Sequence, residues 1–92
     1  MSAGRGTPYA LDAGKLLDEW LADHPSADAQ APVIDFLASL CRDGANRADG
    51  AESVWSPNPE GFIEVRIVWV IDHTLRLVRL ARVGPFVRRR ST

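Results

Sequence analysis

The sequence predicts an α+β fold in which two N-terminal helices pack on a C-terminal antiparallel β-meander of three to four strands. The first half of the chain carries apolar residues at spacings of three and four, the period of an amphipathic helix. The second half alternates apolar and polar residues, the period of a strand with one buried face. The length of 92 residues fits one domain, at residues 9–87, between a flexible tail at 1–8 and a basic tail at 88–92.

Two helices are expected in the first half. The first spans Leu11–Ala22 with Asp12 as its N-cap, and it ends at His24-Pro25 because the residue before a proline disfavours helical geometry. The second spans Pro32–Arg42, with its proline in the first turn and Gly44 as the stop signal. A short connection between them predicts an antiparallel pair.

A meander is expected after a polar loop at Asn46–Glu52. A short strand begins at Val54, the proline-containing segment Ser56–Gly61 is a turn, and a long strand spans Phe62–Ile71. In the long strand every odd-numbered residue from Ile63 onward is apolar. That face is therefore predicted to lie on the core, and the mixed even-numbered face to be partly covered.

Two interpretations of Leu75–Val83 remain open. As a strand it pairs with the preceding one in a hairpin, and we prefer this because a lone long strand needs partners for its backbone groups. On a strand, Arg76 and Arg82 share a face and Arg79 points the other way. As a helix, the segment presents all three arginines as one basic stripe.

Composition excludes several classes of function. Cys41 is the only cysteine, so the chain forms no internal disulfide, and two histidines beside it do not give the spacing of a zinc site. We expect Cys41 to be a small buried hydrophobe, and we expect no metal or cofactor. No apolar run is long enough to span a membrane and no secretory signal is visible, which predicts a cytoplasmic protein that makes no membrane contact.

Charge is unevenly distributed along the chain. Residues 1–60 hold four basic and ten acidic side chains, a net charge of −6, whereas residues 61–92 hold seven arginines and two acids, a net charge of +5. One interpretation is that the C-terminal half binds a polyanion or an acidic protein. The other is that the two halves neutralise each other in the fold.

Three stretches carry a resemblance to the RelE/ParE superfamily of small bacterial toxins. Tyr9-Ala10-Leu11 and the residues after it look like the family's first strand and helix, with a short strand at Pro8–Leu11. Val33–Leu40 looks like the second helix. Val65–Asp72, followed by Leu77–Gly84, is similar to the family's arginine-containing strand, acidic turn and final strand.

The resemblance implies binding, and in ribonuclease members cleavage, of messenger RNA at the ribosome. Arg66 matches the strand arginine of the family, and Arg88 is the nearest candidate for the second one, so these two are the candidate catalytic residues. An arginine suits contact with a scissile phosphate because it is always charged and can donate two hydrogen bonds. The candidate nucleic-acid-binding residues are Arg76, Arg82, Arg89 and Arg90.

The sequence departs from the ribonuclease members in two ways. Tyr9 is the only tyrosine, so the C-terminal tyrosine is absent, and Glu52–Trp55 stands where lysines are common. We therefore expect a toxin-fold component with weak or no mRNA-cleaving activity, partnered by an antitoxin peptide or another acidic protein. The alternative is a non-enzymatic protein-interaction or nucleic-acid-binding module, including a homodimer formed through a sheet edge.

Overall fold

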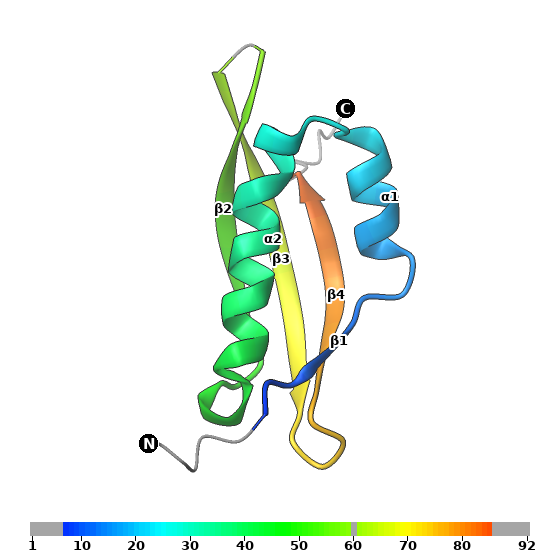
Figure 1. Cartoon of the computed structure of the whole chain (residues 1–92), viewed down its shortest axis with the longest axis vertical. Helices are drawn as coiled ribbons and strands as arrows, with labels where there is room; N and C mark the ends of the chain where they lie inside the picture. The colour runs from blue at the N-terminus through cyan, green and yellow to red at the C-terminus, as the bar shows by residue number, and fades with distance from the viewer. Residues whose placement is uncertain (1–6, 60, 86–92) are drawn as a thin grey trace, which may run out of the picture.

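The computed structural model describes residues 7–59 and 61–85. Its elements are β1 (Ala10–Asp12), α1 (Leu16–Asp23), α2 (Ala27–Arg42), a 3-10 turn η1 (Gly44–Asn46), β2 (Gly50–Asn58), β3 (Gly61–Asp72) and β4 (Leu77–Pro85). The strands form one sheet in the order β1-β4-β3-β2, in which β1 is parallel to β4 and the other neighbours are antiparallel. Both helices cover the same face of the sheet (Figure 1). The predicted α+β fold class is confirmed.

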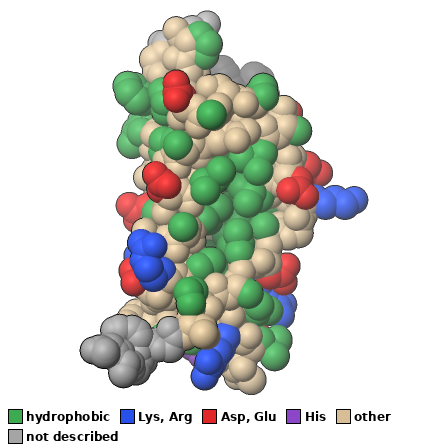
Figure 2. Space-filling view, viewed as in Figure 1, with side chains coloured by type: hydrophobic (Ala, Val, Ile, Leu, Met, Phe, Trp, Pro, Cys, Tyr) green, Lys and Arg blue, Asp and Glu red, His purple; other side chains and the backbone are tan. Residues whose placement is uncertain are grey.

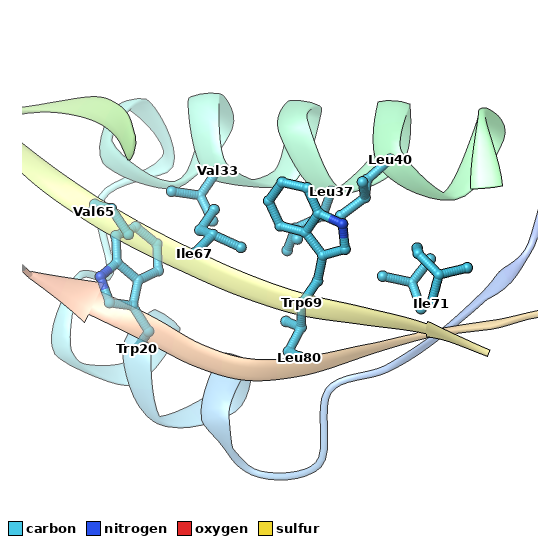
Figure 3. Packing of buried hydrophobic residues seen from close by; sticks show 10 residues of the cluster. Trp20, Val33, Leu37, Leu40, Val65, Ile67, Trp69, Ile71 and Leu80 are labelled. Carbon is cyan, nitrogen blue, oxygen red and sulfur yellow. The ribbon is translucent and has the colours of Figure 1, made fainter. Parts of the chain in front are cut away.

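The core lies between β3 and the helices (Figure 3). The odd-numbered face of β3 is buried from Val65 to Ile71, as its alternation predicts. The Trp69 indole packs against Phe36 of α2, with ring centroids 5.6 Å apart, and its N–H donates to the Ala48 carbonyl at 2.8 Å. The helices contribute the side chains of Trp20, Val33, Leu37 and Leu40. None of the helices described is both long and apolar enough to cross a membrane.

The first helix is shorter than predicted. It begins at Leu16 rather than Leu11, because Ala10–Asp12 pairs with β4 instead of turning into helix. Gly14 separates strand from helix with a φ of 57°, a conformation that glycine adopts at little cost. Asp12 is thus a strand residue and not the N-cap, a position that Lys15 occupies.

The second helix is longer than predicted. It begins at Ala27, so Pro32 lies inside it rather than in its first turn, while its end at Arg42 agrees with the prediction. A proline inside a helix loses one backbone hydrogen bond. Packing favours the extra turn, because Ala29 is buried and its carbonyl accepts a 2.6 Å hydrogen bond from the buried hydroxyl of Ser56 on β2.

The strand β2 extends over both segments that we expected to be irregular. It begins within the predicted loop, at Gly50, and continues through Pro57 to Asn58, which pairs with Gly61 across the hairpin. The prediction of a turn at Ser56–Gly61 is therefore wrong for its first half. Because β2 is at the edge of the sheet, it tolerates a proline that a central strand would not.

The segment after the β3–β4 turn is a strand, so the basic-helix interpretation is wrong. The register of β3 and β4 shifts between Val68 and Trp69, which marks a β-bulge. Arg82 consequently lies opposite Val68 and Arg79 opposite Val70, on the same face of the sheet. The prediction that Arg79 points away from Arg82 is wrong because the extra residue of the bulge changes the alternation.

Gly44 allows the chain before β1 to pack against η1. A Cβ at this position would lie 2.5 Å from Cγ of Tyr9, closer than any side chain tolerates. We expect Gly44→Ala to lower the free energy of unfolding by about 1–3 kcal/mol, measured by urea denaturation. Gly84→Ala is the matched control, because a Cβ there meets no atom within 4 Å in the described chain. Equal stability of the two variants would contradict this account.

Candidate nucleic-acid interface

The helices leave one face of the sheet uncovered, and we call it the helix-free face. The central strand β3 contributes its even-numbered residues to this face, because its odd-numbered residues point into the core. The register of the strands shows which residues of β2 and β4 lie beside them on this face. Ser53 and Trp55 of β2 lie opposite Arg66 and Glu64, and Gly84 of β4 lies opposite Arg66 on the other side.

Arg66 lies at the centre of the helix-free face and is half-buried. Its Nη1–H donates to the Ser53 hydroxyl at 3.2 Å, and that hydroxyl in turn donates to a carboxylate oxygen of Glu64. No ion pair within residues 7–59 and 61–85 involves Arg66. The guanidinium is therefore positioned by a hydroxyl and keeps further donors for a ligand.

Among the described residues, Arg82 is the nearest cationic neighbour of Arg66 on this face. It lies opposite Val68, one diagonal step from Arg66, and such diagonal neighbours are about 7–8 Å apart. Arg82 is exposed, and within the described chain it forms no ion pair. Because Gly84 has no side chain to intervene, both guanidinium groups can approach one bound anion.

Arg79 is partly neutralised. Its guanidinium lies 3.9 Å from a carboxylate oxygen of Asp12 on β1 and 3.8 Å from one of Asp72 at the end of β3. Both pairs are largely exposed to water, so each contributes little to stability. Their effect is to concentrate the unneutralised positive charge of this face at Arg66 and Arg82.

Two exposed aromatic side chains lie at the β2–β3 hairpin end of the same face. Trp55 is 59% exposed and Phe62 is 68% exposed. Trp55 lies opposite Glu64 and Phe62 opposite Pro57, so the two aromatic residues are diagonal neighbours. Trp55 is also a diagonal neighbour of Arg66, so the hairpin places one exposed ring beside that arginine and the second ring next to the first.

The predicted site residues are only partly brought together. Arg66 and Arg82 share the helix-free face, whereas Arg76 lies in the β3–β4 turn with a φ of 57°, at the opposite end from the aromatic pair. The remaining candidates, Arg88, Arg89 and Arg90, lie outside the described residues. Glu64 is the carboxylate beside Arg66, and the Ser53 hydroxyl links the two side chains.

Sequence reasoning missed a polar cluster at the other end of the sheet. The Tyr9 hydroxyl lies 2.8 Å from His73 Nδ1, and His73 Nε2 lies 3.1 Å from the Arg47 carbonyl. Because a carbonyl only accepts, Nε2 carries a hydrogen, and in the neutral ring Nδ1 accepts from Tyr9. His73 therefore does not pair with its neighbour Asp72, whose Oδ1 accepts from the Leu75 amide at 2.9 Å.

Among the described residues, neither the Cys41 thiol nor a group of metal ligands forms a reactive site. Cys41 is only partly buried, and burial raises the pKa of its thiol above the ordinary value, so the thiol is neutral at pH 7. A neutral thiol is neither a nucleophile nor a metal ligand. Among the described side chains, no group of three or more His, Cys, Asp or Glu residues could hold a metal ion.

Comparison with models of protein families, with curated proteins and with solved structures finds no match to this chain. Among the described residues, the helix-free face offers two guanidinium groups that form no ion pair, the Glu64 carboxylate beside one of them, and two exposed aromatic rings.

The Tyr9–His73 hydrogen bond is expected to be structural. Tyr9→Phe removes the hydroxyl and should lower the free energy of unfolding by about 0.5–1.5 kcal/mol, measured by urea denaturation. His73→Ala removes the same bond, and when added to Tyr9→Phe it should have no further effect beyond the loss of the bond to Arg47 and of the edge-to-face contact between the two rings. Independent, additive losses from the two substitutions would show that the side chains are not coupled.

Proposed function

We propose that this chain is a RelE/ParE-like toxin-fold protein that binds single-stranded RNA on its helix-free face and cleaves it weakly or not at all. One observation carries the proposal: the uncovered face joins Arg66 and Arg82 to the exposed rings of Trp55 and Phe62. Arginines bind phosphates, and aromatic rings on an open sheet stack on unpaired bases.

The order of elements supports the family part of the proposal. The short strand that the resemblance implies at Pro8–Leu11 corresponds to β1 at Ala10–Asp12, and two helices and a three-stranded meander follow it. Arg66, the residue that matches the family's strand arginine, is on the open face and not in the core. A buried Arg66 would have counted against any contact with RNA.

The chemistry beside Arg66 favours binding over cleavage. RNA cleavage requires a group that takes the proton of the ribose 2′-hydroxyl and cationic groups that stabilise charge on the scissile phosphate. Glu64 is the proton acceptor beside Arg66, but it already accepts a hydrogen bond from Ser53. Its negative charge also opposes the approach of a phosphate, so we expect weak turnover at most.

RNA binding is tested with a fluorescent single-stranded RNA and polarisation measurements. Trp55→Ala should cost about 1–3 kcal/mol of binding free energy through lost stacking. Arg82→Ala should weaken binding and reduce its salt dependence by about 0.7 in the logarithmic slope, because one phosphate contact is lost. Lys15→Ala, at the start of α1 on the opposite side of the sheet, is the matched control and should bind like the original chain.

The same assay separates RNA from an acidic protein as the ligand. If an acidic peptide competes with RNA only as strongly as its negative charge predicts, the result supports the proposal. RNA should bind more tightly than such a peptide, because its bases also stack on the aromatic rings. Binding of the acidic peptide that is tighter than that of RNA and that survives Trp55→Ala would overturn it in favour of an antitoxin-like or other acidic protein partner.

Cleavage is tested separately. RNA that is incubated with the purified chain should remain uncut over a period in which an active ribonuclease degrades it. Any slow cleavage that belongs to this face should be abolished by Glu64→Gln while RNA binding is kept or strengthened, because the substitution removes a proton acceptor and a negative charge. Rapid cleavage that survives Glu64→Gln would contradict the assignment.

A further inference from the structure

An apolar groove lies on the other side of the molecule, where α1 and α2 spread apart over the sheet. Its volume is about 340 Å³, and we call it the helix groove. Figure 2 shows hydrophobic side chains gathered in a band between the two helices. The groove is lined by Tyr9, Leu11, Leu17, Ile34, Leu37, Ala38 and Cys41.

The α2 side of the helix groove belongs to a second apolar stripe on that helix. The first stripe packs into the core and includes Val33 and Leu40. The second has alternating spacings of four and three residues, the period of a helix that packs along another helix. We call it the outer seam; it consists of Ala27, Ala31, Ile34, Ala38 and Cys41.

Most of the outer seam faces away from the described chain, and only Cys41, at its end, packs against the core. Its four residues from Ala27 to Ala38 are exposed, and Ile34 is 44% exposed. A helix on the surface of one domain needs a single apolar stripe, so two stripes indicate packing on two sides. The small alanine side chains allow close approach of a second helix, and Ile34 projects between them.

We propose that the helix groove is the interface between two copies of this chain, in which α2 of each copy lies antiparallel to α2 of the other. This proposal does not depend on RNA binding, because the groove and the helix-free face lie on opposite sides of the sheet. It also differs from a dimer formed through a sheet edge, because β2 carries Glu52 and Pro57, which disfavour edge pairing.

Charge complementarity identifies the occupant as a second copy in the antiparallel orientation. Asp28 and Arg42 both flank the outer seam on the same side, each next to a seam residue, and Asp35 is midway between them. A two-fold axis near Asp35 therefore sets Asp28 of each copy opposite Arg42 of the other, giving two ion pairs. A parallel arrangement would instead set this flank of one helix against the opposite flank of the other, so that neither ion pair could form.

The same axis makes one unfavourable contact. Asp35 of one copy faces Asp35 of the other, because a residue at the midpoint meets itself. The antiparallel dimer is therefore expected to be moderate in affinity. Removing this like-charge contact should strengthen the dimer, a result that binding to a different partner would not predict.

The first test is the mass of the full chain over a range of concentrations by light scattering. The expected result is a species of twice the 10.1 kDa chain mass that dissociates on dilution. Ile34→Arg introduces a charge into the seam at an exposed position and should give the monomer at every concentration. Circular dichroism and thermal unfolding check that this variant stays folded.

The second test is a charge exchange. Asp28→Arg alone and Arg42→Asp alone should each raise the dimer dissociation constant about tenfold, and the double variant should restore it. Asp35→Asn should lower the dissociation constant. Glu19→Arg, the same change of charge at an exposed position of α1, is the control and should leave it unchanged.

Three results would overturn the proposal. A single mass of 10.1 kDa at all concentrations would show that the groove does not bind a second copy. A dimer that persists in Ile34→Arg would place the interface elsewhere. Failure of the double exchange to restore association lost in the single variants would exclude the antiparallel pairing of α2.

Discussion

Burial of one face of β3 under α2 is the interaction on which the rest of this structure depends. Val65, Ile67 and Trp69 pack against the helix, and the strand's alternation then directs Glu64 and Arg66 to the other side. The long strand needs partners on both edges, which β2 and β4 supply. The open face and its arginines are thus a consequence of how the core is made.

The strong alternation in the sequence made the fold predictable. The ends of some elements and the faces of some side chains depend on packing and bulges, which the sequence alone does not show. Ten alternating residues identified β3 and its buried face from sequence alone. The start of α2 was missed because Pro32 signals a first turn, whereas packing of Ala29 extends the helix beyond it. The β4 bulge moved Arg79 to the face of Arg82, and no local signal marks a bulge in that segment. The Tyr9–His73 bond joins residues too distant in sequence to be paired without the fold.

The two surfaces divide the molecule between different kinds of ligand. The helix layer is acidic with an apolar groove, and the sheet presents Arg66 and Arg82 with exposed aromatic rings. Within the described chain, Asp12–Arg79 is the one ion pair that joins an acid of the first half to an arginine of the second. A dimer through the helix groove would leave the helix-free face of each copy uncovered. One assembly could then present two RNA-binding surfaces.

The most direct test of the central claim is a titration of the isotope-labelled full chain with single-stranded RNA, followed by NMR chemical shifts. We predict that the largest changes fall on Ser53, Trp55, Arg66 and Arg82, with the indole signal of Trp55 affected most by stacking. Signals from the outer seam of α2 should not move. Changes confined to the helices, or no changes at RNA concentrations well above that of the protein, would contradict the assignment of the helix-free face as the functional surface.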